Sequence, residues 1–479
     1  MGKKVLLGLG IVAAVGMGFV ASAITPMLHG ANGFAAKWVC SHVHLAGHSL
    51  ERAGGDLPSN PLLDYLEIEA PDSDRIAVSV FGRFERSAIF REGFGCTLIP
   101  PELERGDLIP TPVRSEPVDR AGDPDPSMPW PPVPDAVDVP AVEAAVERAF
   151  VEEQPDRPKN TRAVVVLYDG ALVAERYADG VDSRTPLLGW SMTKSVLNAL
   201  YGRAVALAHL DLDATPSFEH WGDDRGAITY DQLLRMSSGL AFQEDYGDLD
   251  SDAVQMLFVR ADAGHVAAQQ QLEAAPDAAW SYSSGTSNIL SRALRDALGQ
   301  AAYWDFPRRE LFGPAGMPSA LLEPDPSGVF VASSFGWATA RDWARFGQLY
   351  LDDGVVNGER LLPEGWVGYS VRPTPKAPRG IFGAHFWLNA EVDGGPRWPD
   401  LPSDLYLASG FQGQAVVIIP SRRAVVARLG LSQAESSWDL PAFLADVLAA
   451  LPDGLPSPAD VVAGSPSDDS SALTESGVE

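Results

Sequence analysis

The chain has 479 residues, 46% of them hydrophobic, and its 64 Asp and Glu against 36 Lys and Arg give a formal net charge of −28. This composition is typical of a folded protein, and the length favours one large domain with additional segments. The negative charge repels phosphate backbones and anionic lipid headgroups, which argues against nucleic acid as a partner. Only six of the basic residues are lysine, so a lysine inside the fold would be unusual.

Residues 1–25 predict a membrane-targeting segment. After Lys3 and Lys4, residues 5–24 are apolar or small throughout, a length that suffices for a membrane-spanning helix. A cleaved signal peptide is the alternative, because Ala21-Ser22-Ala23 fits a cleavage site; the long apolar run favours an uncleaved anchor. Both interpretations place the rest of the chain outside the cytoplasm, so we expect a membrane-anchored or secreted, periplasmic protein.

Residues 26–99 contain the two cysteines of the chain, Cys40 and Cys96. We expect a disulfide between them, as an exported protein would form; two unpaired buried thiols are the alternative. His42, His44 and His48 could suggest a metal cluster beside Cys40, but the alternation over residues 40–45 fits an extended strand equally well. We therefore expect no metal site.

Two segments lack the composition of a packed domain. Residues 100–140 contain twelve prolines, a density that blocks both helices and central strands and predicts an extended linker. Residues 453–479 are rich in Pro, Ser, Asp and Gly and predict a disordered acidic tail. Residues 141–452 between them form a domain of catalytic size.

The pattern of that domain predicts an α+β fold. A helix is expected at 142–151, followed by a hairpin whose strands, 163–167 and 171–176, flank Asp169-Gly170. A second hairpin is expected at 415–419 and 424–429, with a helix at 440–451. The segments between the hairpins have helical patterns at 191–207, 230–236, 287–298 and 341–352. One antiparallel sheet, flanked by N- and C-terminal helices, would therefore enclose an inserted helical subdomain.

Ser191 and Lys194 stand three residues apart at the start of a predicted helix, so their side chains share one face. A serine hydroxyl needs a base to become a nucleophile, and a desolvated lysine can serve because burial lowers its pKa. The free N–H groups of a helix N-terminus can stabilise an oxyanion. The alternative is a surface lysine that follows an ordinary N-cap serine. Tyr282, just before another predicted helix, is a candidate partner in proton transfer; ordinary packing of its ring is the other interpretation.

Five ordered segments resemble the β-lactamase-related serine hydrolases, which include class C β-lactamases, DD-peptidases and esterases. They are Ser191-Met192-Thr193-Lys194, residues 233–240, Tyr282-Ser283-Ser284, residues 339–347 and residues 410–414. The resemblance covers about residues 160–450 and is closest to the 6-aminohexanoate-dimer hydrolase branch, which acts on amides and esters. It implies a β-lactamase/transpeptidase-like fold.

The resemblance also implies roles for single residues. Ser191 would be the nucleophile, Lys194 its general base, and Tyr282 would assist proton transfer to the leaving group. Ser284 would replace the asparagine of the usual Tyr-x-Asn, and Tyr246 would lie on a mobile loop and contact substrate.

The third motif, usually Lys-Thr-Gly or His-x-Gly on an edge strand, would fall on Phe411-Gln412-Gly413. The backbone N–H of Gln414 would then form the oxyanion hole with that of Ser191. This motif has no cation to bind a substrate carboxylate, and the second motif lacks its asparagine. Both departures favour small ester or amide substrates over β-lactams.

We therefore expect an exported or membrane-anchored serine hydrolase that acts on a small molecule without metal or cofactor. A Ser-His-Asp enzyme is disfavoured, because no Gly-x-Ser-x-Gly elbow is present, and no nucleotide-binding loop is found. The alternatives are a β-lactamase or DD-peptidase-like enzyme, a non-catalytic binding homologue, and a scaffold in which residues 26–99 are the functional part.

Overall fold

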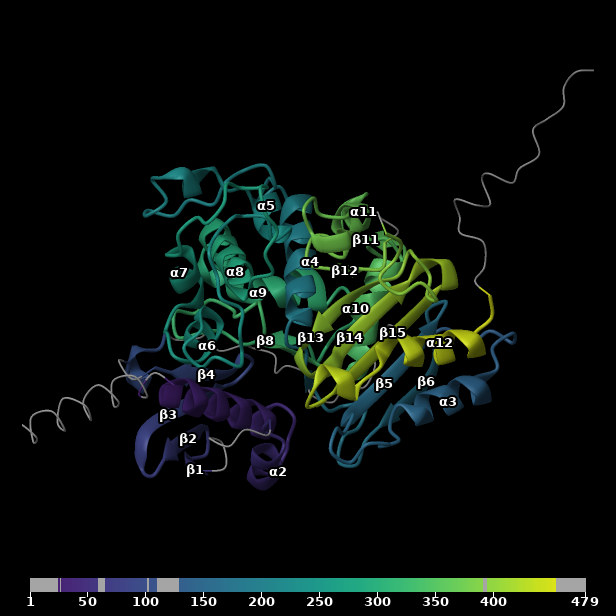
Figure 1. The fold of residues 1–479 in the computed structure, drawn as a ribbon, viewed down its shortest axis with the longest axis horizontal. Helices are drawn as coiled ribbons and strands as arrows, with labels where there is room; N and C mark the ends of the chain where they lie inside the picture. The colour runs from purple at the N-terminus through teal and green to yellow at the C-terminus, as the bar shows by residue number, and fades with distance from the viewer. Residues whose placement is uncertain are drawn as a thin grey trace, which may run out of the picture.

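The structure is a computed structural model that describes residues 25, 27–58, 65–100, 103–109, 129–390 and 394–453. The predicted membrane segment at 1–25, except its last residue, lies outside this range, as do about half of the proline-rich segment and all but the first residue of the acidic tail. Within the described ranges, no helix is long and apolar enough to cross a membrane. Figure 1 shows three parts: the N-terminal region, a helical part and a large sheet.

The large sheet is antiparallel and takes its strands from both ends of the catalytic-sized region, as predicted. Its spatial order is β12 (Trp387–Leu388), β13 (Tyr406–Gly410), β14 (Gln414–Ile419), β15 (Ala424–Gly430), β5 (Thr161–Tyr168) and β6 (Ala171–Tyr177). The pairing of β15 with β5 joins segments some 260 positions apart, for example Val426 with Val166.

Helices cover both faces of this sheet (Figure 1). Val165 and Leu167 pack on the side of α10 (Ala340–Leu351), whereas the alternate residue Val166 packs with α3 (Val139–Arg148) and α12 (Leu440–Ala450). Burial on both faces explains why β5, β14 and β15 are almost continuously apolar.

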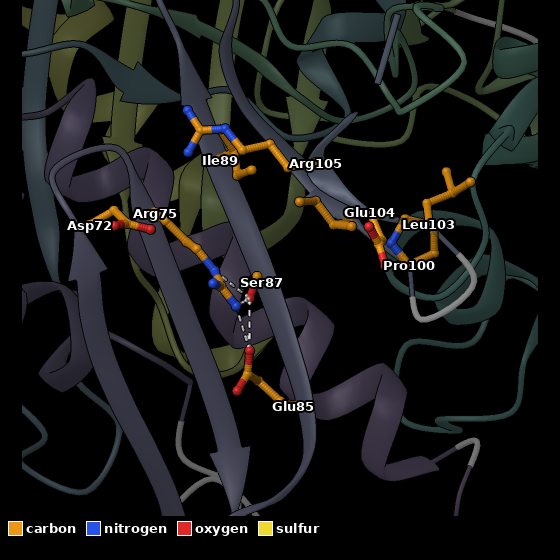
Figure 2. Close-up of a pocket in the computed structure, with 10 residues that line it drawn as sticks. Asp72, Arg75, Glu85, Ser87, Ile89, Pro100, Leu103, Glu104 and Arg105 are labelled. Carbon is orange, nitrogen blue, oxygen red and sulfur yellow. Dashed lines mark hydrogen bonds and ion pairs between the residues drawn. The ribbon is translucent and has the colours of Figure 1, made fainter. Parts of the chain in front are cut away.

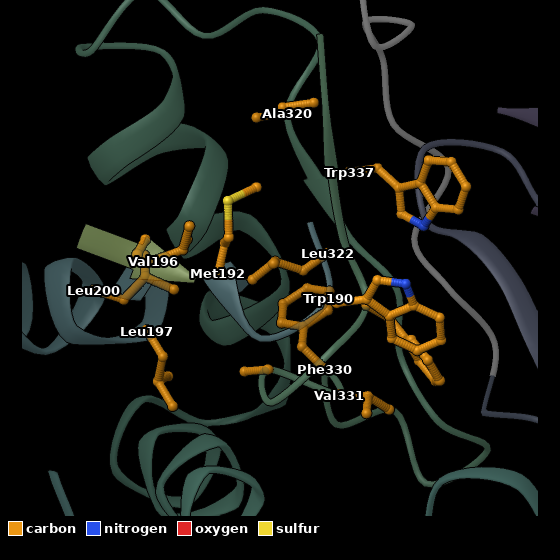
Figure 3. Packing of buried hydrophobic residues seen from close by; sticks show 14 of the residues in the cluster. Trp190, Met192, Val196, Leu197, Leu200, Ala320, Leu322, Phe330, Val331 and Trp337 are labelled. Carbon is orange, nitrogen blue, oxygen red and sulfur yellow. The ribbon is translucent and has the colours of Figure 1, made fainter. Parts of the chain in front are cut away.

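The helical part is inserted between β6 and β12. Its principal helices are α4 (Met192–Ala206), α5 (Tyr230–Leu234), α6 (Asp252–Phe258), α7 (Ala263–Ala268), α8 (Ser284–Leu298), α9 (Gln300–Pro307) and α11 (Trp366–Val371). Met192 at the start of α4 lies near Leu322 in Figure 3, and Val196 and Leu200 farther along this helix belong to the same buried cluster. The helices predicted from the sequence are confirmed, with ends shifted by less than one turn.

Short strands complete this region. They are β7 (Leu187–Leu188), β8 (Leu321–Leu322) and β9 (Gly336–Ala338), paired in the order β7-β9-β8, and the pair β10 (Val355–Val356) and β11 (Glu359–Arg360). The β7 strand leads directly into the turn before α4, so it positions that helix.

The N-terminal region is folded and packs against the helical part. It consists of a helix over residues 27–44, α2 (Leu50–Gly55) and an antiparallel sheet of β1 (Leu66–Asp72), β2 (Arg75–Val80), β3 (Arg83–Arg91) and β4 (Gly95–Ile99). The predicted strand over residues 40–45 is wrong: residues 40–44 are helical. The helix also buries Ala35, Ala36 and Val39, a 3–4 residue spacing that the short window did not show.

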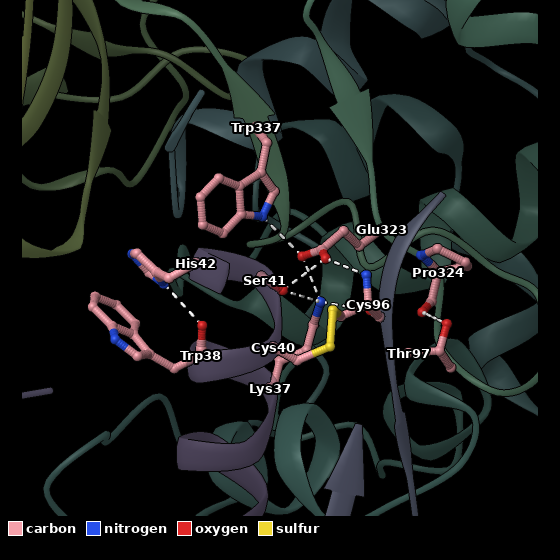
Figure 4. Close-up of a disulfide and its surroundings, with 10 residues drawn as sticks. All are labelled: Lys37, Trp38, Cys40, Ser41, His42, Cys96, Thr97, Glu323, Pro324 and Trp337. Atoms are coloured by element: carbon pink, nitrogen blue, oxygen red, sulfur yellow. Dashed lines mark hydrogen bonds and ion pairs between the residues drawn. A yellow bond between two sulfur atoms is a disulfide. The ribbon is translucent and has the colours of Figure 1, made fainter. Parts of the chain in front are cut away.

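The predicted disulfide between Cys40 and Cys96 is confirmed and ties this helix to β4 (Figure 4). His42 stacks on Trp38 and its Nδ1 lies 2.9 Å from the carbonyl oxygen of Trp38. Among the described residues, no group of three or more His, Cys, Asp or Glu could hold a metal ion.

A buried ion pair fixes the N-terminal helix to the rest of the molecule. Lys37 pairs with Glu323, and both side chains are almost fully buried. Glu323 also accepts hydrogen bonds from the hydroxyl of Ser41 at 2.7 Å, the backbone N–H of Cys96 at 2.6 Å and the indole of Trp337 at 2.8 Å. Each of these contacts comes from a donor, so Glu323 accepts every hydrogen bond, and Lys37 is its ion-pair partner.

Candidate active site

The turn before α4 presents Ser191 at the N-terminus of that helix. Trp190 has a φ of 47°, an uncommon conformation for a bulky residue. It is held by Thr193, whose hydroxyl donates to the carbonyl oxygen of Trp190 at 2.6 Å and accepts from the N–H of Gly336 at 2.9 Å. Ser191 occupies the N-cap position but makes no capping hydrogen bond with its side chain. Its hydroxyl is therefore left for another partner.

That partner is Lys194, one turn along the helix. Its Nζ lies 2.9 Å from Oγ of Ser191, 3.0 Å from Oγ of Ser284 and 3.0 Å from the carbonyl oxygen of Ser333. A neutral amine has two hydrogens and one lone pair. Ser333 and Ser284 can accept the two hydrogens, which leaves the lone pair for the hydroxyl proton of Ser191. Because Lys194 is only 2% exposed, the interpretation as a surface lysine after an N-cap serine is wrong.

Burial also changes the pKa of Lys194. It lowers the pKa of Lys194 from 10.5 to about 8, and the negative charge of Glu244 acts in the opposite direction. A pKa near the working pH suits a general base, since a substantial fraction of the amine is then neutral.

Tyr282 is a neighbour of both Ser191 and Lys194. Nζ of Lys194 lies 4.9 Å from the centre of its ring. Burial raises the pKa of Tyr282, as does the charge of Glu244, while its hydrogen bond with Ser191 lowers it. Its hydroxyl therefore stays protonated near neutral pH and can act as a proton donor or relay beside Ser191.

Ser284 connects Lys194 to an acidic residue that the sequence motifs did not indicate. Its hydroxyl donates to Oε1 of Glu244 at 2.5 Å, and its backbone N–H donates to Oε2 at 2.7 Å. Ser284 begins α8, so this carboxylate lies at a helix N-terminus, where negative charge is stabilised. Tyr246 joins the group, because its hydroxyl lies 3.0 Å from Glu244 and 3.2 Å from Ser284.

Ser333 and Asn288 were also missed by the sequence interpretation. Asn288 is one turn after Ser284 on α8 and binds Ser333 twice: its amide donates to the hydroxyl at 3.1 Å, and its carbonyl accepts from the backbone N–H at 3.2 Å. This clamp fixes the carbonyl that accepts from Lys194. A backbone acceptor has no sequence signature. The predicted helix began at residue 287, whereas α8 begins at Ser284, so the sequence did not place Ser284 and Asn288 on one helix face.

The residues assigned to the third motif connect two strands of the large sheet. Residues 411–413 form a one-turn connection between β13 and β14, both interior strands, whereas the usual motif lies on an edge strand. Gln412 has a φ of 62° and accepts from the indole of Trp190 at 3.3 Å. Arg428 donates to the carbonyl oxygens of Gln412 and Gly413, each at 3.0 Å. The buried cation here fixes the backbone of the motif.

The motif approaches Ser191 through its backbone. Gly410 pairs with Gln414, and a side chain at Gly410 would overlap the carbonyl oxygen of Gly189 and lie 3.2 Å from the backbone nitrogen of Ser191. Among the described residues, that N–H of Ser191 has no hydrogen-bond acceptor. The side chain of Gln414 turns away and binds Gly430 through both its amide nitrogen and its carbonyl oxygen. The side chain of Gln414 is therefore not available to an oxyanion.

A histidine triad has no support in this geometry. His385 is the histidine packed nearest to the lysine, and its Nδ1 lies 2.9 Å from the backbone carbonyl of Lys194. Its Nε2 lies 3.2 Å from the hydroxyl of Ser287. Burial and the charge of Lys194 lower its pKa to about 3, so His385 is a neutral structural link between α4 and α8.

Comparison with known proteins points to one family. The family model described as Beta-lactamase matches residues 147–441, more than half of the chain. The 6-aminohexanoate-dimer hydrolase of Paenarthrobacter ureafaciens is 25% identical over 307 residues, which cover 59% of this chain and 74% of the relative.

Two solved structures share the fold. A Bacillus anthracis protein assigned as a 6-aminohexanoate-dimer hydrolase superposes with a TM-score of 0.52 at 23% identity, over 62% of this chain and 81% of its own. A Bacteroides dorei protein assigned as a β-lactamase gives 0.51 at 14% identity, over 64% and 97%. Residues 27–100 precede the region matched by the family model.

Proposed function

Because this chain belongs to the Beta-lactamase family and is a serine hydrolase, we propose that Ser191 attacks the carbonyl carbon of a small ester or amide and forms an acyl-enzyme. The observation that carries this proposal is the environment of Lys194. Its Nζ is buried, lies 2.9 Å from Oγ of Ser191, and has two neutral oxygen acceptors for its hydrogens.

In the acylation step, neutral Lys194 accepts the hydroxyl proton of Ser191 while Oγ bonds to the carbonyl carbon. The backbone N–H groups of Ser191 and Gln414 stabilise the negative oxygen of the tetrahedral intermediate. Tyr282 passes a proton to the leaving alcohol or amine as the bond breaks. The proton held by Lys194 then returns to the hydroxyl of Tyr282.

In deacylation, water gives a proton to Lys194 and its oxygen bonds to the acyl carbon. The acid leaves as the bond to Oγ breaks, and Ser191 regains its proton from Lys194.

The third motif favours a substrate that has no carboxylate for the enzyme to bind. Arg428, the cation beside this motif, donates to backbone carbonyls, so it is engaged behind the motif. Penicillin-type substrates carry a carboxylate that a cation would bind. We therefore favour simple esters and amides over β-lactams.

The disulfide supports activity outside the cytoplasm. Cys40 and Cys96 are buried and bonded, and such bonds persist mainly in oxidising compartments. We propose that residues 1–25 deliver the enzyme to the periplasmic side and hold it at the membrane.

The test is hydrolysis of p-nitrophenyl acetate and an anilide analogue by wild type, Ser191→Ala and Lys194→Ala. Lys376→Ala is the matched control, because Lys376 is an exposed lysine of the same domain. We expect turnover by wild type and the control and none above background by the other two. Equal activity in Ser191→Ala would contradict the mechanism. Nitrocefin turnover faster than ester turnover would favour the β-lactamase alternative.

A further inference from the structure

An apolar cavity of about 150 Å³ lies between the N-terminal region and the candidate active site. The helix over residues 27–44 contributes Gly30, Ala31 and Phe34 to its wall. The opposite wall includes the aromatic side chains of Trp190, Tyr246 and Phe411.

The aromatic wall belongs to the catalytic machinery. Trp190 immediately precedes Ser191, and its ring meets that of Phe411 edge to face at 5.8 Å between centroids. Phe411 in turn stacks with Tyr246 at 6.1 Å, and the hydroxyl of Tyr246 lies 3.2 Å from Oγ of Ser284. The cavity and the group around Lys194 therefore share a wall.

The lining indicates an apolar ligand. It contains no charged side chain, whereas a charged ligand would need a partner on being desolvated. A cavity of about 150 Å³ with apolar walls can hold a molecule the size of benzene. Phe411 and Tyr246 are 48% and 36% exposed, and a ligand between them and the N-terminal helix would cover them.

A second cavity provides a contrast. It lies on the outer sheet of the N-terminal region and is lined by charged residues that include Arg75, Glu85 and Arg105 (Figure 2). Arg75 is paired with Glu85, and Arg105 with Asp74. These charges satisfy one another, so this cavity has no comparable preference for one class of ligand.

We propose that the apolar cavity binds a ring-sized or short alkyl group attached to the scissile carbonyl or to its leaving group. The N-terminal region would then select the substrate of the hydrolase, although it lies outside the region matched by the family. This inference rests on the proposed function, and it assigns residues 27–44 a direct role in substrate specificity.

The test compares kcat/KM within two pairs of esters. p-Nitrophenyl hexanoate and p-nitrophenyl acetate differ in the length of the acyl group, whereas hexyl acetate and ethyl acetate differ in the length of the leaving alcohol. We expect a preference for the longer substrate of about tenfold or more in at least one series, because each buried methylene contributes about fourfold. Ala31→Leu, which fills the cavity, should reduce that preference about tenfold. The ratio of kcat/KM for the long and the short substrate does not depend on the concentration of folded protein, so partial unfolding of a variant does not affect it.

Ala70→Leu is the matched control, because Ala70 is exposed on β1 of the same region. Leu249→Ala, which enlarges the cavity, is the second variant and should move the preference to longer chains. Chain-length preferences that are absent, or equal in wild type and both cavity variants, would overturn the proposal.

Binding separates this proposal from the proposed function. Calorimetric titration of Ser191→Ala with ethyl hexanoate should show binding that Ala31→Leu weakens about tenfold. Binding of this kind without any hydrolysis by wild type would overturn the proposed function and support the pocket. Hydrolysis by wild type without binding dependent on Ala31 would overturn the pocket alone.

Discussion

Lys37 and Lys194 are both buried lysines, one in the N-terminal region and one in the active site, and their partners differ. Lys37 contacts the carboxylate of Glu323, the hydroxyl of Ser41 and the carbonyl oxygen of Cys96. Lys194 contacts two hydroxyls and a carbonyl oxygen, and its closest carboxylate, that of Glu244, is reached through Ser284.

The difference shows how the same residue type serves two purposes. Burial lowers the pKa of both lysines, but contact with Glu323 opposes this for Lys37. A lysine that faces a carboxylate keeps its charge and joins two parts of the fold. A lysine that faces neutral oxygens can lose its proton near neutral pH, and can therefore serve as a base.

The largest expected effect is the loss of catalysis in Lys194→Met. We expect kcat/KM for an ester to fall by about 10⁴-fold or more, because the nucleophile loses its base. The free energy of unfolding at pH 7 should stay within about 1 kcal/mol of wild type or increase, since the variant buries no charge. Ester kinetics and urea unfolding measure the two quantities. A large loss of stability with retained activity would reverse the roles of the two lysines.

The pH dependence of stability distinguishes this variant further. The pKa of Lys194 is lowered to about 8 in the folded state, from 10.5, so the unfolded chain binds more protons between these values. Wild-type stability should therefore gain a contribution as pH rises from 8 to 10.5, and Lys194→Met should lack it. An identical pH dependence in both proteins would mean that Lys194 is not desolvated.

Lys37→Met should show the opposite pattern. It leaves Glu323 buried without its counter-charge, so we expect the free energy of unfolding to fall by about 3–5 kcal/mol. The kcat/KM of the folded fraction for p-nitrophenyl acetate should stay within a few-fold of wild type. Lys159→Met is the control, because the side chain of Lys159 lies near the surface and donates to the backbone carbonyl oxygen of Arg148. A stability unchanged from that control would show that the ion pair does not hold the N-terminal region.

Removal of the disulfide should have a smaller effect in the same direction. We expect the double variant Cys40→Ser, Cys96→Ser to lose about 2–4 kcal/mol of unfolding free energy, because the crosslink restricts the unfolded chain. Thermal unfolding with and without reductant measures it. Wild type in reductant should match the double variant, and a reductant effect on the double variant itself would point to a cause other than this bond.

Glu244→Gln should produce the smallest change, a shift of the pH profile. The charge of Glu244 raises the pKa of Lys194, so its removal should lower the midpoint of kcat/KM against pH below 8. Asp245→Asn is the control, because the exposed Asp245 accepts from the N–H of Gly247 and does not contact Ser284. A midpoint that rises in Glu244→Gln would contradict the arrangement.

The sequence predicted the parts that depend on local pattern. Ser191 and Lys194 share a helix face at fixed spacing, and the strands of the two hairpins are apolar because both faces are buried. The pairing of Lys37 with Glu323 could not be predicted, since the two residues are 286 positions apart and neither has a motif. The carbonyl of Ser333 and the carboxylate of Glu244 reach Lys194 only through the packing of loops. The strand predicted over residues 40–45 is wrong because a window of six residues is compatible with both the two-residue period of a strand and the 3.6-residue period of a helix.

The most direct test of the account is the rate at which a fluorophosphonate labels the protein between pH 6 and 10, with the modified residue identified by mass spectrometry. We predict one label, on Ser191, whose rate rises with pH to a plateau with a midpoint near 8, and no such label in Lys194→Met. Labelling at another residue, or a rate on Ser191 that does not depend on pH or on Lys194, would contradict the central claim that Lys194 is the base for Ser191.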